Sequence, residues 1–272
     1  MSRTTVGGPG TPQRYAHSLW LLSARDLKVR YATSMLGYLW SVLDPLVMSL
    51  IYLMVFTFFF KKDVGAEPYI VYLIAGLLPW VWFNTSVSDF TRAFRKDAKL
   101  VRSTSIPRSI WINRIVLSKG IEFLCSLPVL ALFVIIDMLV ETDPARTAHI
   151  GWGLLLLPVA IIMQTVLLVG LGMLVAPLCV MFTDLERTTA LILRALFYAT
   201  PVIYSVQNLP EPFQSILSFN PLTGIFMLYR AAFFPELVEL GPVLISTGMC
   251  AAFLALGVWT FRTLERPVLK EL

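Results

Sequence analysis

The sequence predicts an all-α integral membrane protein with six transmembrane helices, folded as one domain over residues 1–272. Hydropathy, the lengths of the apolar segments and the placement of the basic residues support this fold class. Of the 272 residues, 57% are hydrophobic and only 14% are charged, and the mean hydropathy is +0.75. Because a soluble domain carries about 25% charged residues, most of this chain is expected to be solvated by lipid.

Six apolar segments are candidate spans, since a helix needs about 20 mostly apolar residues to cross a bilayer. They are Leu39–Phe60, Tyr69–Val87, Ile115–Leu139, Trp152–Phe182, Thr189–Tyr204 and Pro242–Phe261. The fourth is longer than a bilayer requires, which predicts a tilt, a kink near Pro177 or a start outside the lipid. Together the segments define a six-span core over residues 39–261.

The basic residues predict the orientation of the spans because lysine and arginine are enriched in cytosolic loops. Of the 22 lysines and arginines, all but four fall before the first span, after the second, after the fourth or after the sixth, with Lys119 and Arg194 counted at the cytosolic ends of the third and fifth spans. The exceptions are Lys61, Lys62, Arg146 and Arg230. This asymmetry predicts that both termini are cytosolic, with a loose tail at 1–13 and a second tail at 262–272.

Residues 14–31 predict an amphipathic helix that lies in the plane of the lipid headgroups. Its apolar positions recur at spacings of three or four and are Ala16, Trp20, Ala24, Leu27 and Tyr31. Its polar positions include Arg14, Ser18, Arg25 and Lys28. Asp26 precedes Arg30 by four residues, a spacing at which the two side chains can pair. Alternatively, the basic residues only set the topology, which requires no helix.

The segment before the last span predicts two short re-entrant helices on the extracellular side, Glu211–Ser218 and Pro221–Phe234. A single span here is disfavoured because Asn220-Pro221 would interrupt it and Arg230 would lie in lipid. Re-entrant backbone is tolerated where protein or water covers it. The segment is therefore expected to line a cavity or a partner surface.

The sequence lacks the motifs of several enzyme classes. It contains no G-x-x-x-x-G-K-[ST] phosphate loop, no H-E-x-x-H and no G-x-S-x-G. The chain is therefore not expected to hydrolyse ATP by itself. The three cysteines are widely spaced in apolar segments and the two histidines are isolated, so no metal site is predicted. The net charge of +5 does not indicate nucleic-acid binding, because it is concentrated in the predicted cytosolic loops.

Few acids lie within the predicted spans. Asp44 and Asp89 are near the cytosolic span ends, and Glu122 lies inside the third span. Lys119 is three residues before Glu122, so a local ion pair is expected. Without a line of carboxylates or histidines the sequence does not favour a proton relay. The remaining polar feature is the basic loop "RAFRKDAKLVRSTSIPRSIWINR" at 92–114, which could bind anionic lipid, dock a soluble partner or only set the topology.

Three motifs, in this order, resemble the permease subunits of type-2 ABC exporters of the polysaccharide group, which serve O-antigen, teichoic acid, capsule and galactan. The first is Arg25, Asp26, Leu27, Arg30, Tyr31, Leu36, Gly37 and Trp40, followed by Asp44-Pro45. The second is Lys99-Leu100-Val101-Arg102 with Ile106-Pro107-Arg108, and the third is Phe219-Asn220-Pro221-Leu222 with Leu228-Tyr229-Arg230. Asp44 departs from the asparagine that is frequent in the family.

The resemblance implies a homodimer of this chain with two copies of a separate cytosolic ATPase, in the plasma (inner) membrane of a bacterium. ATP and Mg would bind to the partner subunit and no cofactor to this chain, which would be a transport subunit and not an enzyme. The residues implied to couple to the ATPase are Arg95, Lys99, Leu100, Val101, Arg102, Ile106, Pro107, Arg108, Asp184 and Glu186.

The resemblance also implies a lipid-linked glycan as substrate, carried on a polyprenyl pyrophosphate. The implied entrance residues are Arg25, Asp26, Lys28, Arg30 and Tyr31. The aromatic residues implied to line the channel are Trp40, Tyr52, Trp82, Tyr198 and Tyr204. The residues implied to form the outer gate are Asn220, Pro221, Tyr229 and Arg230. The alternatives are an exporter of a small lipophilic compound and a scaffold of glycan synthesis without ATP coupling. The basic pI and the Ala/Arg/Leu-rich composition suit a high-GC bacterium, and on that ground a cell-wall galactan is the hypothesis for the glycan.

Overall fold

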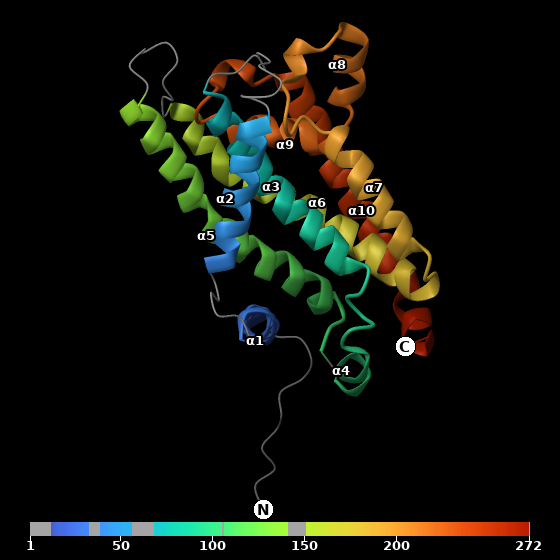
Figure 1. Ribbon diagram of the computed structural model, residues 1–272. Helices are drawn as coiled ribbons and strands as arrows, with labels where there is room; N and C mark the ends of the chain where they lie inside the picture. Colours follow the sequence, from blue (N-terminus) through green and yellow to red (C-terminus); the bar gives the residue numbers. More distant parts are fainter. Residues whose placement is uncertain (1–11, 33–38, 56–67, 105, 141–150, 272) are drawn as a thin grey trace, which may run out of the picture.

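The computed structural model describes residues 12–32, 39–55, 68–104, 106–140 and 151–271, and it is helical there with no strand. This confirms the predicted all-α class. Figure 1 shows long helices that run side by side, with shorter helices at both ends of the bundle. The helix α1, Pro12–Tyr31, lies across one end, next to the start of the helix α5, Ser109–Val140.

Four helices are long and apolar enough to cross a membrane, judged by length and composition over the described residues. They are α3 (Tyr69–Phe90), α5, α6 (Leu157–Met181) with the 3₁₀ turn η3 (Trp152–Leu156) before it, and α10 (Leu240–Glu271). They correspond to the second, third, fourth and sixth predicted spans. The remaining two predicted spans differ in the structure.

The fifth predicted span, Thr189–Tyr204, does not form as one helix. The helix α7 begins earlier, at Leu185, and ends at Tyr198, after 14 residues. At about 1.5 Å per residue it is roughly 21 Å long, less than the ~30 Å of a hydrocarbon core. Pro201, which has no N–H to donate, follows in an irregular segment. Within α7 only Leu193 is buried.

The first predicted span is represented by α2, Trp40–Leu53, which also has 14 residues. The end of that predicted span, 56–60, lies outside the described residues. The helix α2 contacts α3 and α5. The structure therefore supports four spans by length, and neither 14-residue helix reaches the length of a span by itself.

The centre of the fold is α3, which contacts α2, α5, α6, α7 and α9. Its apolar side chains, such as Tyr72 and Phe90, are buried around its whole circumference. Such a helix belongs inside a bundle. Gln164 of α6 donates a hydrogen bond of 2.8 Å to the carbonyl oxygen of Pro79 in α3, so a buried polar group joins these two helices.

The helices α6 and α10 approach each other backbone to backbone. A Cβ atom placed on Gly170 of α6 would lie 2.6 Å from the backbone nitrogen of Leu254 in α10, and one on Gly257 would collide with the carbonyl of Gly170. Small residues at both positions let helices pack this closely. The seam formed by Gly170 and Gly257 therefore accepts no larger side chain.

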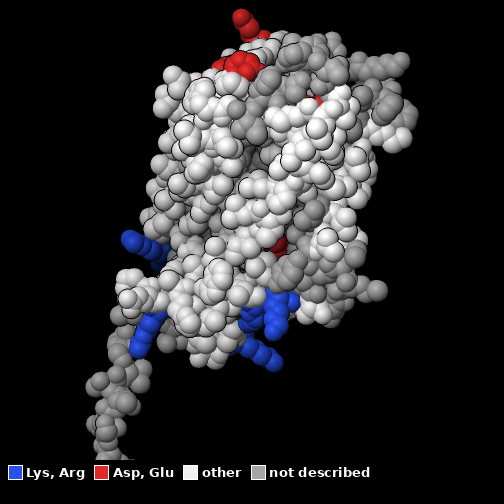
Figure 2. Space-filling view, turned by 90° about the vertical axis from the view of Figure 1, so that its left-hand side faces the viewer, with Lys and Arg blue, Asp and Glu red and all other residues white. Residues whose placement is uncertain are grey.

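The two ends of the bundle differ in charge. The helix α1, the short helix α4 (Ala98–Ser103) and the C-terminal end of α10 lie at one end, and α8 (Glu211–Ser218) and α9 (Pro221–Arg230) lie at the other (Figure 1). Figure 2 shows lysine and arginine at the first end and acidic residues at the second. We call the first, which carries α1 and α4, the basic end.

The helices α8 and α9 lie at the positions of the two short helices predicted before the last span. The first has the predicted bounds, and the second ends at Arg230, four residues before the predicted Phe234. Asn220 separates them: its side chain accepts a hydrogen bond from Leu222 N (2.9 Å) and donates one to the carbonyl oxygen of Ala199 (2.9 Å). Residues 222–230 are all buried, so protein covers the backbone of α9, as a re-entrant segment requires.

Candidate functional site: a charged cavity at the basic end

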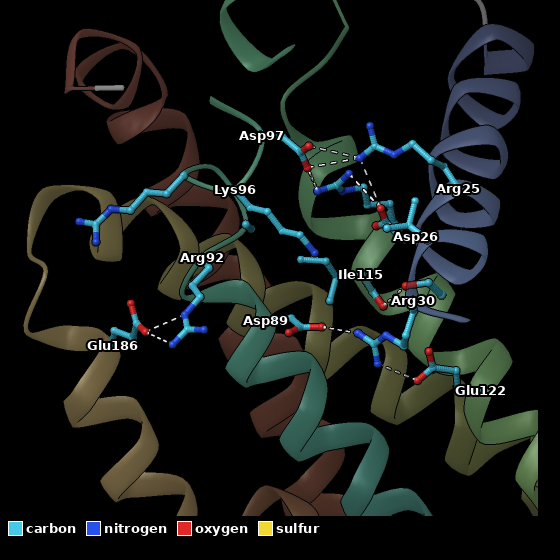
Figure 3. A pocket seen from close by; sticks show the side chains of 15 residues that line it. Arg25, Asp26, Arg30, Asp89, Arg92, Lys96, Asp97, Ile115, Glu122 and Glu186 are labelled. Carbon is cyan, nitrogen blue, oxygen red and sulfur yellow. Dashed lines mark hydrogen bonds and ion pairs between the residues drawn. The ribbon is translucent and has the colours of Figure 1, made fainter. Parts of the chain in front are cut away.

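A cavity of about 930 Å³ opens at the basic end, between α1, the end of α3, the turn that leads to α4, α5 and the start of α7. Six cationic and five carboxylate side chains line it. They are Arg25, Arg30, Arg92, Arg95, Lys96, Arg114, Asp26, Asp89, Asp97, Glu122 and Glu186. Figure 3 shows that the labelled charged side chains come from different helices and that several of them meet in ion pairs. The cavity therefore gathers charges that are far apart in the sequence.

Four of these residues form an interlocked group, which we call the Asp97 cluster: Arg25, Asp26, Asp97 and Arg114. The Arg25 guanidinium lies 3.3 Å from Asp97 Oδ1 and 3.4 Å from Asp26 Oδ1. Arg114 of α5 contacts both carboxylates as well, at 3.4 Å from Asp26. The Arg114 side chain is only 3% exposed. The carboxylates of Asp26 and Asp97 thus compensate the buried Arg114 cation. Burial of this cation without them would be costly.

A second group, the Asp89 cluster, lies one helical turn further along α1 and consists of Arg30, Asp89, Lys119 and Glu122. Arg30 lies 3.2 Å from both Asp89 and Glu122. Lys119, 4% exposed, lies 3.1 Å from Glu122 and 3.8 Å from Asp89. The predicted Lys119–Glu122 pair is confirmed. The predicted Asp26–Arg30 pair is wrong, because each side chain is drawn to a buried cation or carboxylate on another helix.

Further contacts join the turn before α4 to α6 and α7. Arg92 pairs with Glu186 at the start of α7, and this hydrogen bond raises the pKa of the Arg92 guanidinium. Arg95 donates a hydrogen bond of 3.2 Å to the carbonyl oxygen of Val180, near the end of α6. Among the described residues, Arg95 and Lys96 are the lining cations for which no ion pair with a carboxylate is found.

The predicted coupling residues lie around α4 at the basic end. Val101 is buried, Leu100 and Ile106 are half-buried, and Lys99, Arg102 and Pro107 are exposed. Arg108 lies 3.3 Å from Glu265 of α10. Asp184 precedes α7 and is exposed, whereas Glu186 lines the cavity. The segment is therefore anchored by apolar side chains and presents a basic outer face.

The predicted entrance residues are only partly together. Arg25, Asp26 and Arg30 line the cavity, but Lys28 is exposed outside it, and the Tyr31 side chain lies outside the described part of the structure. On α1, Leu27 is buried, whereas Ala16, Trp20 and Ala24 of the predicted apolar stripe face outward. Sequence reasoning missed Asp97 and Arg114; the signal for Asp97 was the single acid within an otherwise basic loop.

The predicted channel aromatics fall into two groups. Trp82 is buried inside the chain and stacks on Phe123, with ring centroids 5.1 Å apart. Trp40 and Tyr198 are exposed, Tyr52 and Tyr204 are half-buried, and the Tyr204 hydroxyl donates to the Tyr198 carbonyl oxygen (2.9 Å). The surface-facing members thus come from α2, α7 and the segment after α7.

Of the predicted gate residues, Pro221 is half-buried and begins α9, whereas Tyr229 and Arg230 are buried at its other end. The Arg230 guanidinium donates to the carbonyl oxygens of Pro201 (2.6 Å), Val202 (2.7 Å) and Tyr72 (3.2 Å). It fits there because Gly76 of α3 has no side chain to occupy the space. Arg230 thus joins α9 to α3 and to the segment after α7.

Comparison with known proteins identifies the family. Residues 17–234 match the ABC-2 type transporter family. The chain belongs to this family of transporter permeases. An O-antigen export system permease from Klebsiella pneumoniae is 34% identical over 217 residues, which cover 79% of each chain. A second from the same organism is 31% identical and covers 89% of this permease and 90% of its own length. A polysialic acid transport protein from Escherichia coli is 23% identical over 91% of this permease and 93% of its own length.

Proposed function

We propose that this permease is the membrane subunit of an ATP-driven exporter that moves a polyprenyl-pyrophosphate-linked polysaccharide across the bacterial inner membrane. The observation that carries the proposal is the similarity to O-antigen export permeases along most of the chain. The substrate class includes O-antigen, teichoic acid and cell-wall galactan. Lipid linkage accords with the position of α1, whose exposed Trp20 and outward apolar residues would lie among the lipid headgroups.

The proposed assembly is a homodimer with two cytosolic ATPase subunits, which would bind ATP and Mg. The segment around α4 would dock the ATPase, since its outer face exposes Lys99 and Arg102 and buried Val101 fixes it to the bundle. Basic residues beside apolar anchors suit a groove with acidic walls. Asp184, exposed at the start of α7, would provide a second contact.

In the proposed topology both termini are cytosolic and the chain crosses the membrane six times. The concentration of lysine and arginine at the basic end supports this orientation. The helices α2 and α7 would belong to the first and fifth of the six crossings. The helices α8 and α9 would form the re-entrant outer gate, with Asn220 and Arg230 holding the segment after α7.

The proposed entrance for the anionic lipid head is the basic end, beside α1. The carboxylates of the two clusters already engage Arg25 and Arg30, so these arginines attract an anion less than their number suggests. Lys28 and Lys96 are exposed cations there and would supply the remaining attraction. The polysaccharide would then pass the exposed aromatic side chains of α2 and α7, because sugars stack on aromatic faces.

Depletion of the permease in its host tests the proposal. Lipid-linked glycans are extracted before and after depletion and compared with cells rescued by the wild-type gene. We expect a long polyprenyl-linked polymer to accumulate inside the cell, and its sugar analysis names the substrate. An unchanged lipid-linked pool with a normal envelope would contradict the proposal and favour export of a small lipophilic compound. Purification without any ATPase would favour a scaffold role.

A further inference from the structure

Asp97 has an unusual role for a residue at its position. It is the N-cap residue of α4, where an aspartate ordinarily accepts hydrogen bonds from the backbone of the first turn. Its side chain makes no such bond. Instead it reaches away from α4 to Arg25 of α1 and Arg114 of α5 (Figure 3). The Asp97 carboxylate thus forms contacts between helices and does not cap α4.

The contact through Arg114 resists separation. Because Arg114 is only 3% exposed, moving Asp97 away from it would leave a buried cation with Asp26 as its remaining carboxylate. The backbone of Arg114 also accepts a hydrogen bond from Ser23 of α1 (3.3 Å). The same region of α5 therefore holds α1 by its backbone and α4 by its side chain.

The Asp89 cluster repeats this arrangement one turn along. Arg30 of α1 bridges Asp89 at the end of α3 and Glu122 of α5. Two balanced groups, each of two cations and two carboxylates, thus join α1 to the corner between α3 and α4 and to α5. Since each group contains one nearly buried cation, bulk salt screens these contacts less than surface pairs. A displacement of Asp97 at the start of α4 would be passed to α1 through the Asp97 cluster, while the Asp89 cluster keeps α1 joined to α3 and α5.

We propose that Asp97 is a positioning residue that transmits movement of α4 to α1, so that closure of the partner ATPase shifts the helix beside which the lipid-linked substrate enters. This inference rests on the proposed function. It assigns Asp97 and its partners Arg25 and Arg114 a mechanical role in coupling, distinct from ATPase docking and from substrate contact.

The test uses the full permease co-expressed with the ATPase with which it copurifies, reconstituted in vesicles that contain the lipid-linked polymer isolated after depletion. The variants are Asp97→Asn, which removes the charge, and Arg25→Gln, which is expected to fold because the Arg25 side chain is 40% exposed. Glu265→Gln is the matched control: it also removes one carboxylate from an ion pair at the basic end, Arg108–Glu265, but not one that involves α1.

We expect Asp97→Asn and Arg25→Gln to assemble with the ATPase and hydrolyse ATP near the wild-type rate, while polymer exported per ATP falls at least about fivefold, the size of a typical coupling between sites. The double variant should be no worse than Asp97→Asn alone, because both remove one linkage. Glu265→Gln should keep the wild-type ratio. If Asp97→Asn fails to insert, Arg25→Gln is compared with Arg25→Lys, which keeps the positive charge for an anionic lipid head but loses the planar fork that holds Asp97 and Asp26; a fall in exported polymer per ATP in both variants supports the linkage, and a fall in Arg25→Gln alone contradicts it.

Three results would overturn the inference. They are a wild-type ratio of export to hydrolysis in Arg25→Gln, a parallel loss of hydrolysis and export, which indicates docking, and additive losses in the double variant. A wild-type complex that neither hydrolyses ATP nor exports polymer would overturn the proposed function itself. Failure of the inference is thus distinguishable from failure of the function.

Discussion

The guanidinium of Arg230 lies 3.6 Å from the centre of the Tyr72 ring. Among the described residues it forms no ion pair with a carboxylate. Three carbonyl oxygens accept its hydrogen bonds instead. Two of them belong to Pro201 and Val202, in the irregular segment after α7. Arg230 therefore replaces the backbone hydrogen bonds that this segment cannot make within a helix.

Arg230→Met is expected to lower the free energy of unfolding by about 2–4 kcal/mol, because buried carbonyl oxygens lose their donor. Arg230→Lys should recover only part of it, since an ammonium lacks the planar fork of the guanidinium. The measurement is thermal unfolding in detergent. The control is Arg262→Met, because Arg262 is an exposed arginine on α10. Equal losses of stability in Arg230→Met and Arg262→Met would refute this role of Arg230.

Gly257→Ala should destabilise the permease, whereas Gly248→Ala should not. A methyl group on Gly257 collides with the Gly170 backbone, but one on Gly248 of the same helix meets no atom within 4 Å. We expect a loss of about 1–3 kcal/mol for the first and a change near zero, or a gain of a few tenths, for the second. Equal unfolding temperatures for the two variants would show that α6 and α10 can separate without cost.

Glu122→Gln should cost more stability than Asp89→Asn, although both carboxylates belong to the Asp89 cluster. Glu122 lies closer to the nearly buried Lys119, at 3.1 Å against 3.8 Å, and its side chain is 18% exposed against 46% for Asp89. A less exposed partner of a buried cation contributes more, so we expect about 2–4 kcal/mol for Glu122→Gln. Unfolding of the two variants side by side checks the order, and the reverse order would contradict it.

Replacing both Lys99 and Arg102 with glutamate should abolish copurification of the ATPase and leave the unfolding temperature unchanged. Both side chains are exposed, so charge reversal changes the docking face and not the core. The control is reversal of Arg262 and Arg266, exposed on the last turns of α10. Undiminished copurification of the glutamate variant would place the ATPase contact elsewhere.

Hydropathy predicted the interior of the long helices but not their ends. The third predicted span starts at Ile115, yet α5 begins at Ser109, because Arg114 pairs with carboxylates and is tolerated in a buried turn. Likewise α10 continues to Glu271 through the predicted tail 262–272, where Val268 is buried and Glu265 meets Arg108. Tertiary partners, which a hydropathy window does not register, extend both helices.

The sequence predicted less of the cavity than of the helices. The Lys119–Glu122 pair follows from local spacing, and the basic loop was recognised as a functional segment. The partners of Arg25 and Arg30, however, lie 59–92 residues away along the chain, apart from the neighbouring Asp26. Such contacts depend on how α1 lies across α5, and no periodicity in one sequence reports this. The sequence alone therefore suggests that Arg25 and Arg30 are available to bind an anion, whereas in the structure both are paired with carboxylates.

The single buried residue of α7 has a consequence for how the bundle can open. Besides Leu193, α7 packs the half-buried Leu196 and Phe197 against the core, and Phe197 lies against Trp80 with ring centroids 5.3 Å apart. Pulling α7 outward uncovers these few apolar contacts, so such an excursion costs less free energy than opening the fully buried interior. Parting α6 from α10 would instead break a contact of backbone on backbone along the Gly170–Gly257 seam. The molecule thus divides into a stiff frame and a loosely held wall, and any pathway that widens and narrows during a cycle would widen along α7.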